Sequence, residues 1–230
     1  MPSSQLDGRS AEAADPSAKP RAAEAIFHAL RMEIAFGQLR PRERLIEHDL
    51  CQRFGTSNHN IRQAFELLDR VGLVDRKANR GVEVKALTAS ELTDLYEVRV
   101  LLQREGARKI DLSRAEDIAE HLTAINARYA AALIADCVED AVRANDAFHL
   151  ATFDYCTNAD LAALQRTYWL KASAVISRAL SDRTLSQASL QDHALIITAI
   201  RNRDLAQLVQ TAVGHIQPAV DVYRRIYGLS

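Results

Sequence analysis

Three histidines in the second half of the chain are the residues whose types and spacing best suit metal chemistry. Asn145 and His149 are four residues apart, so they project from one face of a helix. His193 and His215 fall on the last two helices that the sequence predicts. Neutral imidazoles with one oxygen ligand suit Zn²⁺, Ni²⁺, Fe²⁺ or Mn²⁺, and the ligand types do not choose among these ions. Open coordination positions would admit water or an effector carboxylate.

The alternative for each histidine is a structural one. Taken singly, a histidine on a helix is more often a hydrogen-bonded polar side chain than a metal ligand. Periodicity alone therefore leaves both interpretations open.

A second group of polar residues lies where a helix is expected to begin. In a helix-turn-helix, the first residues of the second helix of the motif face base edges. Asparagine can pair bidentately with adenine, and arginine with guanine or a phosphate. The candidates for such contacts are Ser57, Asn58, His59, Asn60 and Arg62.

A basic turn follows this helix, with Arg80 and Gly81 as its candidate DNA contacts along phosphates or in the minor groove. Six basic and three acidic residues between Arg53 and Arg80 give that segment a charge of +3 within a neutral chain. The alternative is a solvated helix start and a solvated hairpin. Because both signals occur in the right order, we favour DNA binding.

The elements that must position these residues are mainly helical. The chain has 230 residues, of which only 8 are Gly and 5 are Pro, so long helices are favoured over a turn-rich all-β fold. The net charge of −1 excludes a strongly basic chain that coats nucleic acid along its whole length. We expect residues 1–20 to be a disordered tail.

Residues 21–86 are predicted to form a winged helix-turn-helix, which consists of three helices and a two-stranded hairpin. Residues 87–230 are predicted to form an all-α antiparallel bundle of about six helices. Two of these helices should open with capping boxes, at Thr88–Glu91 and at Ser113–Glu116. Pro218 should kink the last one.

Nothing in the sequence predicts export or membrane insertion. No apolar run approaches the roughly 20 residues that a membrane span needs, and the N-terminus has no apolar signal segment. Three isolated cysteines are expected to be reduced thiols. We therefore expect a cytoplasmic protein without a membrane partner.

The first third of the chain resembles the DNA-binding domain of GntR-family transcription regulators. The resemblance rests on Pro41, Leu45, Glu47, Leu50, Phe54-Gly-Thr-Ser57, Ile61-Arg62-Gln-Ala64, Gly72-Leu73-Val74 and Arg80-Gly81-Val82-Glu83-Val84. Two departures stand out: Arg42 occupies a usual Gly position, and Asn58-His59-Asn60 replaces Arg-Thr-Pro. The second departure predicts an operator that differs from the family's usual one.

The helical remainder resembles the FCD effector domain of the FadR subfamily, and its length fits the VanR-type branch. The matching motifs are Asn145-Asp146-Ala147-Phe148-His149, Asp192-His193 before Ile196, and a His on the final helix. The resemblance implies that Asn145, His149, His193 and His215 are metal ligands and that Arg99 grips a carboxylate effector. It leaves His121 as a surface residue, and it places Asn145 where the family has Asp.

The resemblance and the residues together predict a ligand-responsive transcription regulator that is not an enzyme. We expect a homodimer that represses from a palindromic operator on double-stranded DNA and is released by a small carboxylate bound at or near a divalent metal ion. Two alternatives remain. One is a metal-dependent hydrolase with a fused helical domain, which lacks a HExxH motif here. The other is an adaptor whose winged helix binds protein.

Overall fold

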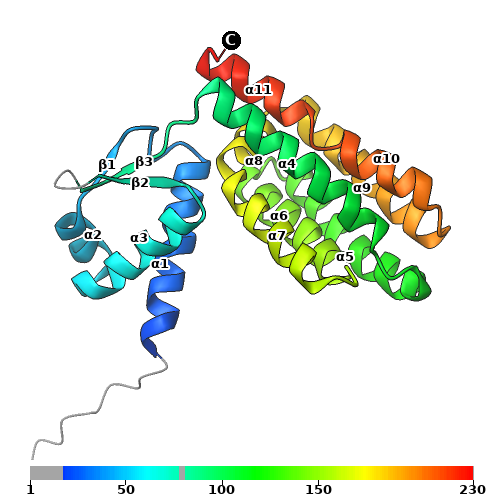
Figure 1. The fold of residues 1–230 in the computed structure, drawn as a ribbon, viewed down its shortest axis with the longest axis horizontal. Helices are drawn as coiled ribbons and strands as arrows, with labels where there is room; N and C mark the ends of the chain where they lie inside the picture. The colour runs from blue at the N-terminus through cyan, green and yellow to red at the C-terminus, as the bar shows by residue number, and fades with distance from the viewer. Residues whose placement is uncertain (1–17, 78–80, 230) are drawn as a thin grey trace, which may run out of the picture.

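The computed structural model describes residues 18–77 and 81–229 (Figure 1). Its first part, which we call the winged-helix region (residues 18–85), combines helices with a small sheet. The elements are α1 (Ala18–Ala35), β1 (Arg44–Leu45), α2 (Glu47–Phe54), α3 (Asn58–Arg70), β2 (Val74–Lys77) and β3 (Gly81–Val84). Helix α1 begins at Ala18, so the predicted tail ends earlier than residue 20. The rest of that tail lies outside the described residues.

The sheet of the winged-helix region contains one strand more than the predicted hairpin. Its order is β1-β3-β2, and both pairings are antiparallel. Val74 of β2 lies opposite Val84 of β3, and Arg44 of β1 lies opposite Glu83. The short third strand anchors the segment before α2 to the wing.

The core of the winged-helix region is apolar. Helix α3 buries Ile61, Phe65 and Leu68 against Leu30 of α1, and each of these four side chains is almost fully enclosed. This spacing places one apolar stripe on the helix. The opposite face of α3, which starts at Asn58, is therefore left to solvent.

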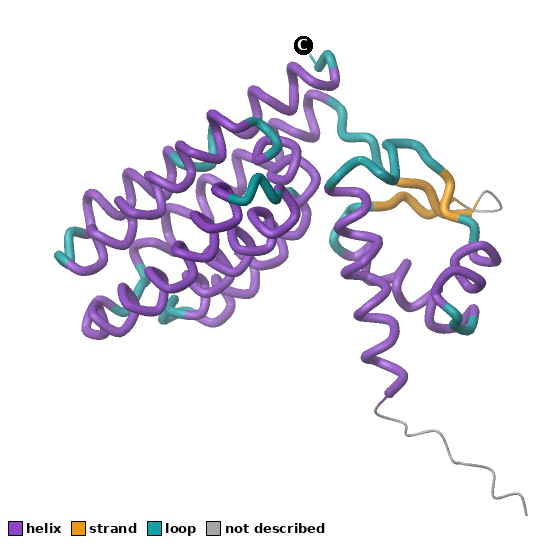
Figure 2. The backbone as a smooth tube through the Cα atoms, turned by 180° about the vertical axis from the view of Figure 1, so that it is seen from behind, coloured by secondary structure: helices purple, strands orange, loops and turns teal. Residues whose placement is uncertain are grey.

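The helical region (residues 88–229) is an all-α bundle (Figure 2). Its helices are α4 (Ala89–Arg108), α5 (Ala115–Ile134), α6 (Val138–Asp154), α7 (Ala159–Lys171), α8 (Ser173–Leu180), α9 (Arg183–Arg201), α10 (Leu205–Gly214) and α11 (Pro218–Tyr227). The predicted mainly-α architecture, a winged helix followed by a helical bundle, is confirmed.

Two of the predicted helices are each divided in two, so the described part of this region has eight α-helices rather than six. The fourth predicted helix is α7 and α8, which meet at Ala172. The sixth is α10 and α11. Pro218 is the first residue of α11, where a missing N–H leaves no hydrogen bond unmade, so it starts a helix instead of kinking one.

One predicted capping box forms and the other does not. The Thr88 hydroxyl accepts a hydrogen bond from the Glu91 backbone N–H, and the Thr88 N–H donates to the Glu91 carboxylate. Ser113 does not cap a helix. Its N–H donates to Asp111 instead, and residues Leu112–Arg114 form a short 3₁₀-helix before α5.

Helix α1 joins the two regions. Its Met32, and Phe36 just after its end, pack against the core of the helical region. Leu170 of α7 and Ala174 of α8 pack in turn against the core of the winged-helix region. The contact is therefore a packed interface and not only a chain connection. Within the described part of the chain, no helix is long and apolar enough to cross a membrane.

Candidate functional site

Three of the predicted ligands converge inside the helical region. His149 of α6, His193 of α9 and His215 after α10 bring nitrogen atoms within 4.8 Å of one another. The His149 Nε2 lies 3.1 Å from the His215 Nε2 and 3.3 Å from the His193 Nε2. The break between α10 and α11 places His215 here, because that residue is the C-cap of α10.

The outer nitrogens of two of these rings face hydrogen-bond acceptors. The His215 Nδ1 lies 3.1 Å from the Asp192 carboxylate, and the His193 Nδ1 lies 3.1 Å from the Asn126 side-chain oxygen. In the neutral imidazole each Nδ1 therefore carries the proton, and each Nε2 presents a lone pair to the centre of the cluster.

Burial keeps His149 and His193 neutral. His149 and His193 are fully enclosed, with exposed fractions of 1% and 0%. Burial, and then repulsion from the charge that His215 carries when it is protonated, lowers the pKa of His149 well below its usual range. The same two causes lower the pKa of His193. Neutral imidazole is the form that binds metal.

The geometry fits a metal ion. Zinc binds imidazole nitrogen at about 2.0–2.1 Å, so neighbouring ligand atoms in tetrahedral or octahedral sites are about 2.9–3.4 Å apart. The two short nitrogen separations, 3.1 and 3.3 Å, fall in this range. One proton on His149 could serve only one of its two neighbours, so lone pairs still face each other unless a cation lies between them.

Asn145, the fourth predicted ligand, lines the cavity beside the histidine cluster, whereas the next residue, Asp146, points away from it. Asn145 is buried and lines the same cavity as His215. Asp146 points elsewhere: its carboxylate accepts hydrogen bonds from Arg31 and from the Trp169 indole. Asp146 is thus occupied and offers no oxygen to the cluster.

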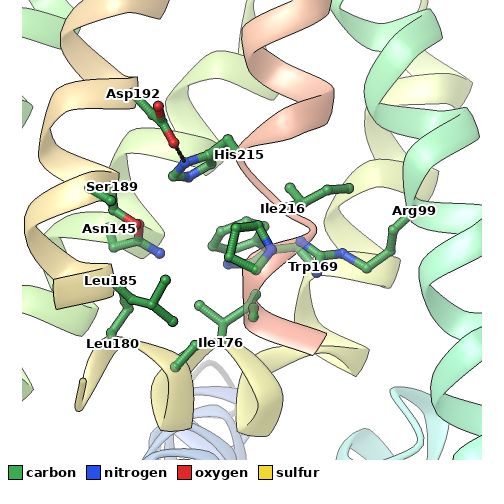
Figure 3. Close-up of a pocket in the computed structure, with 14 residues that line it drawn as sticks. Arg99, Asn145, Trp169, Ile176, Leu180, Leu185, Ser189, Asp192, His215 and Ile216 are labelled. Atoms are coloured by element: carbon green, nitrogen blue, oxygen red, sulfur yellow. Dashed lines mark hydrogen bonds and ion pairs between the residues drawn. The ribbon is translucent and has the colours of Figure 1, made fainter. Parts of the chain in front are cut away.

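A cavity of about 50 Å³ adjoins the histidine cluster (Figure 3). Such a volume holds a few water molecules, which matches a small effector. One wall comes from Arg99 and Trp169, and the wall across from it comes from Asn145 and Ser189. The rest of the lining is mostly aliphatic: Ile176, Ala179, Leu180, Leu185, Ala188 and Ile216.

Arg99 is a buried cation without an acidic partner among the described residues. Its guanidinium carbon lies 4.6 Å from the Tyr96 ring centre and 5.4 Å from the Trp169 ring centre. Its Nη1 atom is enclosed and makes no hydrogen bond. Burial lowers its pKa, although a guanidinium stays charged at neutral pH. An anionic ligand would satisfy this group.

The aromatic residues that could line the cavity divide clearly. Trp169 lines it, and its ring centre lies 4.2 Å from that of His149. Tyr129 packs in the core against His193. His121 is exposed and hydrogen-bonds to the Tyr155 hydroxyl, in agreement with its prediction as a surface residue.

The predicted DNA contacts cluster at the start of α3. Ser57, Asn58, His59 and Arg62 are all exposed there. Ser57 is the N-cap residue, but its side chain makes no capping hydrogen bond. The Arg62 Nε donates to the Glu47 carboxylate at 2.9 Å, and this exposed pair lies on the same face.

Two of these contacts are modified by intramolecular hydrogen bonds. The Asn58 oxygen accepts from the Cys51 thiol at 3.1 Å, so its amide group is left to donate. Asn60 is half-buried and donates to the Thr56 hydroxyl, which turns it away from solvent. Gly81 is exposed at the start of β3 with φ of 85°, and Arg80 lies outside the described residues.

Sequence reasoning missed the residues that orient the site. Asn126 holds His193 from α5, yet no motif or spacing connects these two positions. The ion pair between Arg31 and Asp146 joins α1 to α6 over 115 positions of the chain, so no local pattern could predict it. Asp192 belongs to the Asp192-His193 motif, but the motif does not predict that its carboxylate faces the Nδ1 of His215.

The fold and the site together define a winged-helix DNA-binding protein with a small, mostly apolar cavity beside a histidine cluster in its second region. Comparison with protein families places it further. Residues 22–84 match the bacterial regulatory proteins of the gntR family, and residues 94–218, more than half of the chain, match the FCD domain. The chain belongs to the GntR family of transcription regulators, with an FCD domain after its winged helix. It is a DNA-binding regulator and not an enzyme.

Individual relatives agree with this assignment. The uncharacterized HTH-type transcriptional regulator BphR of Paraburkholderia xenovorans is 27% identical over 220 residues, which are 90% of this chain and 86% of BphR. McbR/YncC of E. coli has the same fold, with a TM-score of 0.73 at 15% identity over 90% of this chain and 98% of that one. A structure from Rhodococcus sp. RHA1, described as a GntR transcriptional regulator, has a TM-score of 0.64 at 24% identity. It aligns with 91% of this chain and 99% of its own.

Proposed function

We propose that this regulator is a homodimeric repressor released from DNA by a small carboxylate that binds beside a metal ion in the helical region. In this proposal residues 21–86 form the DNA-binding domain and residues 87–230 form the effector-binding and dimerisation domain. Two copies related by two-fold symmetry would read a palindromic operator.

One observation carries the metal part of the proposal: the Nε2 atom of His149 lies within 3.3 Å of those of His193 and His215, so the three imidazoles form one cluster. Asp192 and Asn126 hold the outer nitrogens, so the inner ones are free to coordinate. His149, His193 and His215 would bind the ion, with Asn145 as an oxygen ligand. The ion would supply a cationic anchor with open coordination positions. Zn²⁺, Ni²⁺, Fe²⁺ and Mn²⁺ all suit these ligands.

The charge of the site favours an anionic effector. Three neutral histidines and a neutral Asn145 bring no negative charge, so Asp192, the one carboxylate among the described residues of the cavity lining, would offset only part of the charge of a divalent ion. Arg99 adds a buried positive charge on the cavity wall, with Nη1 unpaired. A carboxylate would offset both charges, and Arg99 could bind it bidentately.

The effector would act by favouring one of two arrangements of the DNA-binding domains. A ligand shifts such an equilibrium only through its different affinity for the two arrangements. The face of α3 that carries Asn58, His59 and Arg62 is exposed and available to DNA. Release on effector binding is the outcome expected of a repressor.

Metal content of the purified protein is the first test. We expect about one divalent ion per chain, measured by elemental analysis, and loss of that ion in His149→Ala and His193→Ala. His121→Ala is the matched control, because His121 lies on the surface outside the cluster. Equal metal content in wild type and both cluster variants would contradict the proposed site.

The effector is tested by titrating small carboxylates into a complex of metal-loaded protein and an operator obtained by selection from random DNA. A carboxylate that binds the cavity should weaken DNA binding in wild type but not in Arg99→Met. Retention of the response in Arg99→Met would remove Arg99 from the proposed site. Carboxylates that bind but tighten the DNA complex would contradict release of the regulator by its effector.

A further inference from the structure

A buried ion pair crosses the interface between the two regions. The Arg31 Nη2 of α1 donates to the Asp146 Oδ2 of α6 at 2.9 Å, and both residues are 8% exposed. The surrounding contact is apolar, because Met32 of α1 and Phe36 in the turn after it pack on the helical region. Arg31 is the sole charged or polar side chain among the buried residues described in the winged-helix region.

The second oxygen of the same carboxylate binds the wall of the effector cavity. The Asp146 Oδ1 accepts a hydrogen bond from the Trp169 Nε1 at 2.9 Å. The Trp169 ring lies against His149, with 4.2 Å between ring centres, and close to the Arg99 guanidinium. One carboxylate therefore holds α1 with one oxygen and the cavity wall with the other.

The pair is sensitive to small movements. The Arg31 Nε and Nη1 atoms are buried and have no hydrogen-bond partner, so Asp146 alone compensates the buried guanidinium. A buried charge with a single partner is costly to leave unpaired. A shift of Trp169 that turns the carboxylate would weaken the bond that holds α1.

A cleft open to solvent next to Arg31 could also accommodate its side chain. A cleft of about 530 Å³ lies beside it, between α1 and α6, and is lined by Glu33, Glu139 and Arg143 as well as Arg31 itself. The guanidinium could be hydrated in this cleft. The structure shows the side chain paired with Asp146, and the cleft leaves room for a second arrangement turned to solvent, as a coupling element requires.

We propose that Arg31, Asp146 and Trp169 form the connection through which ligand binding in the cavity changes how α1 packs on the helical region. This proposal takes from the proposed function only the identity of the ligand that occupies the cavity. Occupation of the site displaces the Trp169 indole, the indole reorients the Asp146 carboxylate, and the carboxylate tightens or loosens its hold on Arg31. Because α1 packs on α3, the change reaches the helix that reads DNA.

Hydrogen exchange of the α1 amides tests the connection without any ligand. Trp169→Phe keeps an aromatic ring but removes the Nε1 donor. In the metal-free variant we expect the exchange rates of residues 22–35 to rise about two- to thirty-fold relative to those of α5. This is the change in rate that corresponds to the coupling energies found in packed networks, about 0.5–2 kcal/mol. Tyr129→Phe is the matched control. It also loses one buried hydrogen bond in the helical region, from its hydroxyl to the Ser186 carbonyl oxygen, and it should leave α1 unchanged.

A second arm uses zinc alone as the probe. Zinc should alter α1 exchange in wild type, and the double variant Arg31→Met/Asp146→Asn should bind zinc equally well but lose the α1 response. The double variant removes both charges, so no unpaired ion is left in the interface. Zinc binding is measured separately, by competition with a chromophoric chelator.

The outcomes separate the two proposals. Unchanged α1 exchange in Trp169→Phe, or a full zinc response in the double variant, would overturn the connection and leave the metal site standing. Absence of zinc binding in wild type would overturn the metal site. The Trp169→Phe comparison would still decide the connection in that case.

Discussion

The two regions of the molecule place their functional residues in opposite locations. The winged-helix region has an apolar core built around Ile61, Phe65 and Leu68, and its candidate DNA contacts are on the surface. The helical region carries its candidate ligands inside, where His149 and His193 are fully enclosed. Arg31 alone departs from this division among the described residues of the first region, and it reaches into the second.

The difference separates what a substitution can do in each region. On α3, binding residues and core residues occupy different faces, so DNA affinity and stability can change independently. In the helical region the binding residues are part of the core, so ligand binding and stability are linked through the same side chains.

The largest effect is expected from the core of the winged-helix region. Phe65→Ala should lower the free energy of unfolding by about 3–5 kcal/mol, because it leaves a cavity between α1 and α3. Urea unfolding followed by circular dichroism measures the loss. The loss should be the same with zinc and with chelator. If zinc restored the stability lost in Phe65→Ala, the stability of the winged-helix region would depend on the metal site of the helical region.

Acid should destabilise the metal-free helical region. The pKa values of His149 and His193 are lowered on folding, so the unfolded chain binds more protons below its usual histidine pKa of about 6.5. This contribution to stability is therefore fully present above about pH 6.5 and is lost progressively as the pH falls toward the lowered pKa values of the folded protein.

Chemical denaturation in chelator at pH 7.5 and at lower pH measures this dependence. His149→Gln should flatten it, whereas His121→Gln should not, because His121 is exposed. An unchanged pH dependence in His149→Gln would show that the cluster does not carry the linkage.

DNA affinity should change without stability at the surface of α3. Asn58→Ala and Arg62→Ala should each weaken binding to a selected operator by about 1–3 kcal/mol if they read bases. Their unfolding free energies should stay within about 0.5 kcal/mol of wild type, since both side chains are exposed. Fluorescence anisotropy and urea unfolding give the two numbers.

Arg70→Ala is the matched control for Arg62→Ala. It removes the same charge from the last turn of the same helix. If Arg62→Ala and Arg70→Ala each weaken binding equally for all DNA sequences, Arg62 contacts a phosphate and not a base. A large loss of stability in either α3 variant would break the contrast between the regions.

The sequence predicts much of this arrangement because much of it is local. The apolar stripe of α3 follows from residue spacing, and the glycines that end elements at positions 37, 55 and 72 have the positive φ that stops a helix. The histidine cluster required the resemblance as well, since periodicity places each His on a helix but does not bring the helices together.

The parts that could not be predicted depend on tertiary contacts. Helix α7 ends at Lys171 without Gly or Pro, at a point where the chain turns so that α8 can pack on α1 and line the cavity. The Ser113 capping box failed because Asp111 competes for the same N–H. The Arg31–Asp146 pair forms only once both regions are folded.

The smallest effect is expected in the turn before β1, where strain offsets part of the stability of the winged-helix region. Arg42 has φ of 68°, a backbone conformation in which a side chain crowds its own carbonyl. The turn is held from both sides: the Glu43 N–H donates to the Arg40 carbonyl oxygen, and the Arg42 N–H donates to the Val84 carbonyl oxygen of β3. The backbone therefore keeps this conformation whichever residue stands there.

Arg42→Gly should consequently raise the free energy of unfolding by about 0.5–1 kcal/mol, because the relief of strain exceeds the entropy that glycine adds to the unfolded chain. Arg40→Gly, in the same turn but without a positive φ, should be neutral or destabilising. Urea unfolding of the two variants side by side makes the comparison. A loss of stability in Arg42→Gly would mean that the exposed Arg42 side chain contributes more than its backbone costs. An exposed side chain of the winged-helix region would then contribute to stability, contrary to the contrast between the two regions.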